Sequence, residues 1–325
     1  MTLWGGVRLD LTNAKSKARE LARLSSTIKA AAANPTARSG AKPGGTSAGA
    51  WLLATPLAIV LGIFLVIPIL MLVVVSFLDY NSVQIIWSFV VQNYIDAVSS
   101  AATWQTFAVT LKYAVITWAI TLFLGFWLSY FLAFEVRGAA WQMGLFLVCS
   151  IPFLTSNIIR TISWIPALGR NGIVNSVLLH FHLIHQPLTF LLYSQFAIIL
   201  AFVHLNTLFM VTPIFNSMMR IDRTLIEAAR DNGAGFWQTI LNVILPLSKT
   251  GIGIGTIFVI TLVMGDFVSV SIMGGGQSAS VGIMIQNEMS QLQYPAAAAN
   301  AVILLAIVLI MVFLILRVVD IRKEL

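Results

Sequence analysis

A charged segment between two apolar stretches, residues 216–250, holds the pattern in this sequence that is most able to do chemistry. Thr224 and Glu227, three residues apart, fit a capping box at the start of a short helix, and Gly233 suits the left-handed backbone that ends one. A second short helix over residues 236–245 would stop at Pro246. The first helix would carry an exposed charged face suited to pairing with a partner rather than to catalysis, made of Arg223, Glu227, Arg230 and Asp231. A plain solvated loop is the alternative interpretation.

Two ionisable residues, Arg160 and Asp266, lie inside apolar runs. A charge at the centre of a bilayer costs about 2.5–3.5 kcal/mol on insertion scales, so such residues persist mainly where they face a bundle interior or water. Both are expected toward the outer face of the membrane. A contact with a solute, a structural ion pair between the two, and a position among lipid headgroups all stay open.

Three histidines, His180, His182 and His185, form an HxHxxH cluster that could ligate zinc on paper. That spacing does not place all three rings on one face, and no acidic residue lies within the segment to orient them. We expect interfacial histidines and no metal site.

Motifs for covalent or nucleotide chemistry are absent from the sequence. It has no GxxxxGK[ST] phosphate-binding loop, no HExxH and no nucleophile elbow. The one cysteine, Cys149, excludes an intrachain disulfide. We therefore expect a protein that is not an enzyme and that binds no cofactor itself.

The elements that must position these residues are membrane-spanning helices. Apolar residues make up 58% of the 325 residues and charged residues only 10%, against about 25% charged in soluble domains. Runs of about 20 apolar residues are long enough to cross hydrocarbon as helices. The sequence predicts an all-α polytopic membrane protein with six spans, at about residues 52–76, 107–134, 138–159, 188–215, 251–272 and 296–316.

The positive charge sets the expected orientation. Residues 1–50 form a basic tail with a net charge of +6, out of +7 for the chain, followed by a membrane domain over residues 51–325. With the tail, Arg137, the segment from Arg220 to Lys249 and the end after Leu316 in the cytoplasm, 16 of the 19 Lys and Arg residues lie inside, as the positive-inside rule requires. Both termini are then cytoplasmic. Because the membrane part is nearly neutral, a nucleic-acid partner is excluded, and the tail is expected to contact anionic lipid.

The spacing within the charged segment resembles the EAA motif of ABC importer permeases. The resemblance places the motif on Glu227, Ala228, Ala229, Gly233, Leu245 and Pro246, with Val243 where isoleucine is usual, and it includes the neighbouring Arg230 and Asp231. In that family the segment forms the coupling helix, which sits in a cleft of the cytoplasmic ATPase subunit.

Further motifs resemble the spermidine/putrescine-type permeases. They are Pro152 to Trp164 with its Arg-Thr pair, Gly169 to Asn175, Gly265-Asp266-Phe267 and the glycines 274–276. The resemblance covers residues 51–325 and implies the type I ABC importer permease fold. It implies a permease subunit in a bacterial inner membrane that forms half of a pathway for a small polar solute, and the implied solute is a polyamine-like cation. The implied partners are a second permease subunit, two ATPase subunits that use ATP and Mg²⁺, and an extracytoplasmic solute-binding protein.

Acidic residues on the outer side are the expected receivers of a cation. The candidate path residues are Asp266, Arg160, Trp164, Asp79, Asp96 and Glu288. Other readings stay open: an importer of an amino acid derivative, a phosphonate or a metal ion complex, a secondary transporter or channel, or a membrane scaffold. A secondary transporter or channel would need ion-coupling charges at the midplane or a filter, and the sequence shows neither.

Overall fold

The structure, a computed structural model, describes residues 55–57, 59–81 and 85–319. The basic tail predicted over residues 1–50 lies outside them, as do residues 320–325. The chain divides into two units, Met1–Val66 and Ile67–Leu325. The described residues of the first unit are helical and include η2 (Gly62–Val66).

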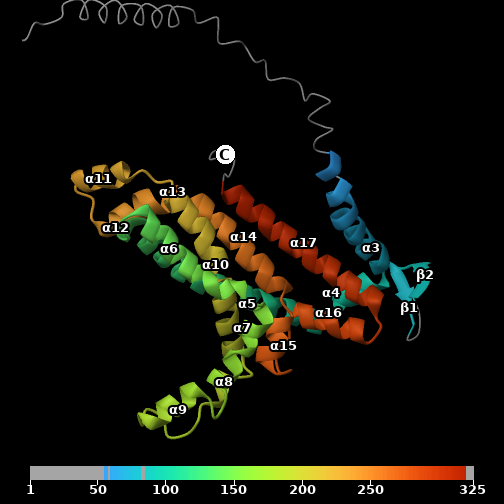
Figure 1. The fold of residues 1–325 in the computed structure, drawn as a ribbon. Helices are drawn as coiled ribbons and strands as arrows, with labels where there is room; N and C mark the ends of the chain where they lie inside the picture. The colour runs from blue at the N-terminus through green and yellow to red at the C-terminus, as the bar shows by residue number, and fades with distance from the viewer. Residues whose placement is uncertain (1–54, 58, 82–84, 320–325) are drawn as a thin grey trace, which may run out of the picture. The chain divides into compact units, whose positions relative to one another are not determined.

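The second unit is helical apart from one small antiparallel hairpin, β1 with β2, which the all-helical expectation did not include. Figure 1 shows the course of the chain. Its elements are α3 (Ile67–Ser76), β1 (Leu78–Tyr80), β2 (Ile85–Phe89), α4 (Gln92–Ser99), α5 (Ala101–Tyr130), η3 (Phe131–Glu135), α6 (Ala139–Ser150), η4 (Ile151–Leu154), α7 (Asn157–Ile162), α8 (Trp164–Leu168), α9 (Ile173–His180), η5 (Thr189–Leu191), α10 (Gln195–Met218), α11 (Arg223–Asp231), α12 (Phe236–Thr239), η6 (Ile240–Ile244), α13 (Leu245–Leu247), α14 (Lys249–Gly265), α15 (Val268–Gly274), α16 (Val281–Ser290) and α17 (Tyr294–Val318).

Helices α5, α10 and α14 pack together to form the core, while α3 and α16 pack on α17. The largest fully buried side chains of this core include Tyr113, Phe202, Met210, Ile214 and Met264. Ser100 and Ser194 cap α5 and α10 by accepting from the backbone N–H groups of Thr103 and Ala197, so the first turns keep few unpaired donors. The three helices therefore form one packed body.

Two hydrogen bonds between polar groups join the helices of this body, where little water is available to pair them. The indole N–H of Trp118 in α5 donates to the hydroxyl of Thr256 in α14 at 2.9 Å. The Ser129 hydroxyl donates to the Val211 carbonyl of α10 at 3.1 Å. These bonds fix α5 against both of its neighbours.

Four helices within the described residues are long and apolar enough to cross a membrane: Thr55–Ser76, Ala101–Glu135, Gln195–Met218 and Tyr294–Val318. Two further pairs qualify if each bent pair counts as one span, Ala139–Leu154 with Asn157–His180 and Phe236–Leu247 with Lys249–Gly265. The predicted six spans thus correspond to four continuous helices and two bent pairs.

Two predicted spans differ from the structure in shape. The helix expected over residues 138–159 is broken at Thr155 and Ser156, and the chain turns by 88° there. The helix expected over residues 251–272 ends at Gly265, because Asp266 takes an extended backbone and its side chain begins α15 instead. Asp266 and Arg160 consequently lie beside breaks and not within straight spans.

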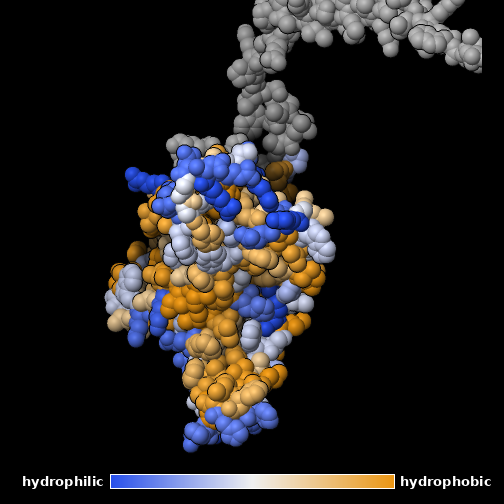
Figure 2. Space-filling view, turned by 90° about the vertical axis from the view of Figure 1, so that its left-hand side faces the viewer, coloured by the Kyte–Doolittle hydropathy of each residue, from blue (hydrophilic) through white to orange (hydrophobic). Residues whose placement is uncertain are grey.

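The outward faces of the helices are apolar. Phe123 of α5 and Phe313 of α17 are 64% and 63% exposed. Figure 2 shows a broad hydrophobic band on one face, with hydrophilic residues gathered above and below it. Such a band is what lipid-facing helices require.

Gly251, near the start of α14, sits where α14 crosses α10 closely. A Cβ atom there would lie 2.4 Å from the Pro213 carbonyl oxygen and 2.7 Å from the Ser217 Cβ. Small residues allow this kind of close approach between membrane helices. Gly251→Ala is expected to destabilise the protein by about 1–3 kcal/mol through overpacking.

Thermal unfolding of the detergent-purified protein measures this effect. Gly144→Ala in α6 is the matched control, since a Cβ there meets nothing within 4 Å and alanine is the better helix former. Equal melting temperatures for Gly251→Ala and the wild type would contradict the close contact.

Candidate functional site

Helix α11 (Arg223–Asp231) carries the predicted coupling residues, and it starts two residues earlier than a capping box at Thr224 would allow. The N-cap is Asp222, whose carboxylate accepts from the backbone N–H of Thr224 at 3.0 Å. The prediction that Thr224 caps this helix is therefore wrong. The bond from Thr224 holds the pKa of the exposed Asp222 carboxyl below its ordinary value.

Gly233 ends α11 as predicted. Its φ is +83°, in the left-handed region that glycine enters without strain. Its N–H donates to the Arg230 carbonyl at 2.8 Å, and the N–H of Ala234 donates to the Ala229 carbonyl at 3.0 Å. These two bonds are those of a Schellman motif, which pairs the last carbonyls of the helix and reverses the chain.

The second helical stretch runs from Phe236 through α12, η6 and α13 to Leu247, one residue beyond Pro246. Pro246 stands in the last turn of this stretch, and the helix ends one residue after it, as is common near a proline. The chain then bends by 68° into α14. The end predicted at Pro246 is thus shifted by one residue.

One face of α11 is tied to the membrane body and the other is free. Ile226 is buried, and the Arg223 guanidinium donates to the Ala133 carbonyl beyond α5 at 3.1 Å. Below it, Tyr130 of α5 contacts Phe236, and Trp127 contacts Trp237, in edge-to-face pairs. The exposed face presents Leu225, Glu227, Ala228, Arg230 and Asp231.

A polar pocket of about 420 Å³ separates α11 from the end of α5. Its lining includes Glu135, Arg137, Glu227 and Arg230. Glu227 and Arg230, for which the sequence predicts a coupling role, therefore line this pocket while remaining exposed to solvent. We call this end of the molecule, which holds α11 and the start of α14, the Glu227 end.

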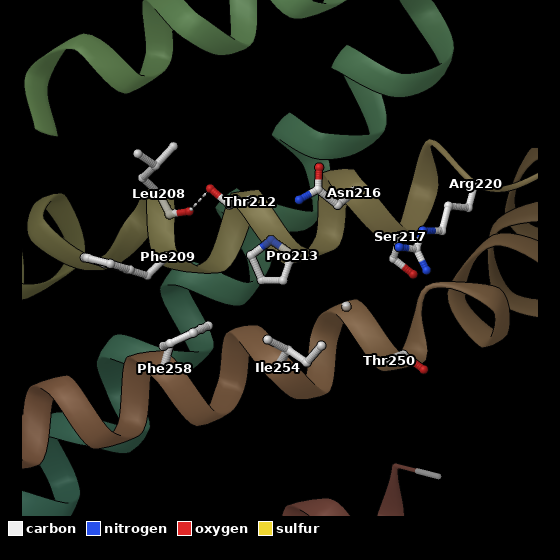
Figure 3. Close-up of a pocket in the computed structure, with 11 residues that line it drawn as sticks. Leu208, Phe209, Thr212, Pro213, Asn216, Ser217, Arg220, Thr250, Ile254 and Phe258 are labelled. Carbon is white, nitrogen blue, oxygen red and sulfur yellow. Dashed lines mark hydrogen bonds between the residues drawn. The ribbon is translucent and has the colours of Figure 1, made fainter. Parts of the chain in front are cut away.

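A groove of about 560 Å³, which was not predicted from the sequence, runs between α10 and α14. Figure 3 shows its lining, with Leu208, Phe209, Ile254 and Phe258 toward one side and Asn216, Ser217, Arg220 and Thr250 toward the Glu227 end. Arg220 is the only charged residue among the lining residues. A signal was available in the sequence, because Leu208, Thr212 and Asn216 recur every fourth residue and so share one face of α10, and Arg220 follows just after its end.

The opposite end of the molecule, which we call the Asp266 end, contains the remaining predicted residues. Helices α7 and α15 pack together there, so Arg160 and Asp266 come from neighbouring elements. Asp266 nevertheless caps α15, accepting from the N–H and hydroxyl of Ser269 at 2.9 and 2.6 Å. Arg160 donates to the Asn157 side chain and stacks on Phe153, 4.5 Å from the ring centroid. The ion pair left open between Arg160 and Asp266 is not formed.

Arg160 retains unused donors. The residue is 7% exposed, and its Nε and Nη1 atoms are buried without a hydrogen-bond partner. Trp164, one turn on, donates from its indole N–H to His204 Nδ1 of α10 at 3.1 Å. Arg160 thus lies on the short helix that follows the break at Thr155 and Ser156, and Trp164 begins the next helix.

Three predicted carboxylates gather around Tyr80 of β1. Burial raises the pKa of the Tyr80 phenol, and the charges of Glu288, Asp96 and Asp79 raise it further. Asp96 is exposed on α4 and accepts from Gln92 at 2.6 Å, while Glu288 accepts from Asn300 of α17 at 2.8 Å. Asp266 is not among the groups that act on Tyr80.

The histidine cluster forms no metal site in the part of the chain that the structure describes. No group of three His, Cys, Asp or Glu side chains there is placed to hold a metal ion.

Comparison with known proteins gives one family. Residues 143–323 match the family model described as binding-protein-dependent transport system inner membrane component. The chain is 30% identical over 244 residues to the spermidine/putrescine transport system permease protein PotB of Escherichia coli K12, covering 74% of this chain and 87% of that protein. It is 28% identical over 259 residues to PotB of Haemophilus influenzae, covering 78% and 88%.

Among solved structures, the chain is similar to one chain of a bacterial alginate ABC transporter in complex with an alginate-pentasaccharide-bound periplasmic protein. The TM-score is 0.67 at 16% identity, over 82% of this chain and 91% of that chain. This likeness concerns the fold, and it confirms the predicted permease architecture.

Proposed function

Because the chain belongs to the family of binding-protein-dependent transport system inner membrane components, the permease subunits of ABC importers, we propose that it forms half of a solute pathway driven by a separate ATPase. The proposed solute is a polyamine-like cation. The proposed partners are a second permease subunit, two ATPase subunits that bind ATP and Mg²⁺, and an extracytoplasmic solute-binding protein.

The observation that carries this proposal is α11. The helix is capped at both ends, anchored on one face by Ile226 and Arg223, and free on the face that bears Leu225 and Glu227. An exposed leucine among charges on a short, rigid helix suits docking into a cleft of another subunit. Movement of that subunit would reach α14 through the continuous helical stretch that ends at Leu247.

In the proposed orientation the Glu227 end faces the cytoplasm and both chain termini lie there. Arg137, Arg220, Arg223 and Arg230 all belong to this end, which supports the assignment through the positive-inside rule. The proposed role of the N-terminal tail is contact with anionic lipid on the same side.

The groove between α10 and α14 is the proposed half of the pathway. The apolar part of the groove has no group that would stabilise a charged solute. Its polar part carries Arg220, and no carboxylate is among the described lining residues. Charge selection is therefore assigned to the Asp266 end, where Asp79 and Asp96 lie around Tyr80. Acidic groups at an entrance raise the local concentration of a cation.

Arg160 and Trp164 are proposed to respond to the opening of the pathway. The two unused donors of Arg160 find no partner in this conformation, and the break beside it permits α7 to move. A second conformation in which these donors are paired would stabilise the open state.

Reconstitution tests the function as a whole. We expect the chain, purified with its partner subunits into vesicles with the binding protein present, to bring an ATPase with it and to take up radiolabelled spermidine when ATP is supplied. Purification without any ATPase, or uptake driven by an ion gradient alone, would contradict the proposal.

The solute assignment is tested at Asp266. Asparagine keeps a side-chain oxygen that can cap α15 but removes the negative charge. We expect Asp266→Asn to lower spermidine uptake while assembly and ATPase activity stay at the wild-type level. Asp266→Ala, which also removes the cap, is expected to reduce uptake and thermal stability together.

The pair of variants distinguishes two roles. Wild-type uptake by Asp266→Asn would show that Asp266 acts only as a cap. The Asp266→Asn variant can also be assayed with a neutral solute that the same complex transports. If uptake of the neutral solute is lost as well, Asp266 does not act by attracting a positive charge.

A further inference from the structure

The side chains of Glu288 in α16 and Asn300 in α17 share one hydrogen bond, and each has a second oxygen that is left unpaired. The Asn300 side-chain Nδ2 donates to Glu288 Oε1 at 2.8 Å. The other two oxygens of the pair, Glu288 Oε2 and Asn300 Oδ1, are buried and have no hydrogen-bond partner. Asn300 is only 4% exposed.

Both unpaired atoms are acceptors. An ionised carboxylate has no hydrogen to give, and the oxygen of an amide only accepts. Buried acceptors without a donor are costly, and the cost is greatest for a charged group. The ionised form of Glu288 thus leaves two oxygens unsatisfied inside the packed contact between α16 and α17.

A single hydrogen atom between Glu288 Oε2 and Asn300 Oδ1 would give both unpaired oxygens a hydrogen bond. A carboxylic acid and a carboxamide that face each other make two parallel bonds: the acid carbonyl accepts from the amide N–H, and the acid O–H donates to the amide oxygen. The first of these bonds is present between Asn300 Nδ2 and Glu288 Oε1. A proton on Oε2 would supply the second, to Asn300 Oδ1.

We propose that Glu288 and Asn300 form a proton-binding site, in which Glu288 is a neutral carboxylic acid at neutral pH and joins α16 to α17 through a closed acid–amide pair. On deprotonation the proton leaves Oε2 for water, the bond to Asn300 Oδ1 is lost, and a negative charge appears in the contact between the two helices.

The surroundings agree with a neutral acid. Burial raises the pKa of Glu288, and the bond from Asn300 opposes this. Helices α5, α14, α15 and α17 pack against α16. Lys112 of α5 donates to Gln195 at 2.9 Å, Lys249 and Arg317 belong to the Glu227 end, and α15 has no titratable residue, so none of these helices pairs a cation with Glu288.

The remaining titratable side chains of the helices packed on α16 are tyrosines: Tyr113 and Tyr130 of α5 and Tyr294 of α17. Outside these helices, the charge of Glu288 acts on the phenol of Tyr80 in β1, as the charges of Asp79 and Asp96 also do. Loss of the proton would add a third negative charge to that cluster. If the proposed cation transport holds, an arriving cation would favour this loss, so proton release at Glu288 would accompany loading of the solute.

Infrared difference spectroscopy tests the protonation state directly. The wild-type protein at neutral pH is expected to show the carbonyl band of a protonated carboxyl group, and Glu288→Gln to lack it. Glu135→Gln is the matched control, since Glu135 is exposed and its loss should leave the band unchanged. Asn300→Leu should shift the band, because the acceptor of the acid O–H is removed.

The pH dependence of thermal unfolding is the second readout. A raised pKa in the folded state means that stability is greatest at acidic pH and falls as pH rises from the ordinary glutamate range through the folded pKa. Glu288→Gln keeps both hydrogen bonds with an amide in place of the acid, so its melting temperature should lack this fall.

Absence of the protonated-carboxyl band from the wild type at neutral pH would overturn the proposal. So would a melting temperature that rises with added sodium ions and not with acidity, because the two oxygens would then hold a metal cation. Neither readout depends on transport, so failure of the proposed transport function would leave this test intact.

Discussion

Gly233→Val is expected to reduce solute uptake by the reconstituted importer about tenfold or more while the complex still assembles. The residue has φ +83°, where a β-branched side chain is strained although a Cβ would meet no atom within 4 Å. Left-handed backbone costs an ordinary residue about 1–2 kcal/mol, which corresponds to roughly a tenfold change in an equilibrium. The turn that fixes the angle between α11 and α12 would then be lost.

Two matched variants isolate the cause. Gly233→Asn should retain most of the uptake, because asparagine tolerates the left-handed conformation. Gly276→Val introduces the same kind of strain, at φ +77°, far along the chain from α11, and should leave coupling intact. Uptake and ATPase rate are measured in the same vesicles.

Glu227→Ala is the second arm of this experiment. Alanine favours the helix, so α11 should keep its structure while losing the exposed carboxylate. We expect ATP hydrolysis without uptake. Wild-type uptake by both Gly233→Val and Glu227→Ala would remove the coupling role assigned to this segment.

The end of α11 was predictable and its start was not, for reasons that lie in the local chain. Gly233 is the first glycine after the charged helical stretch, and glycine enters the left-handed region without strain. At the start, both Asp222 and Thr224 are good N-caps. Arg223 favours Asp222, since its bond to the Ala133 carbonyl holds the first turn of α11 against η3. That contact joins residues 90 positions apart.

The spans show the same division between local and distant causes. Hydropathy located the apolar stretches, because the length of a spanning helix depends on bilayer thickness. It did not reveal that Asp266 would end α14 by binding Ser269, since the carboxylate had an equally plausible partner in Arg160. Nor did it show the groove, which needs the faces of α10 and α14 to be set against each other.

Arg160→Met is expected to leave the folded protein as stable as the wild type, or more stable, and to abolish uptake. The Arg160 side chain is buried, and two of its nitrogens have no partner. Replacing buried charged groups with apolar residues of similar volume is often neutral or stabilises a protein by about 1–4 kcal/mol. Methionine can also keep the contact with Phe153, because its thioether packs well against an aromatic ring.

A residue that serves only the fold would give the opposite result for Arg160→Met, a lower melting temperature with loss of assembly. Arg170→Met is the control, since Arg170 is exposed in the loop before α9 and should change neither quantity. Wild-type uptake by Arg160→Met would exclude Arg160 from the transport cycle. A stable, assembled and inactive Arg160→Met complex would instead show that an unpaired guanidinium is retained against its cost because its unused donors are needed in another conformation of the pathway.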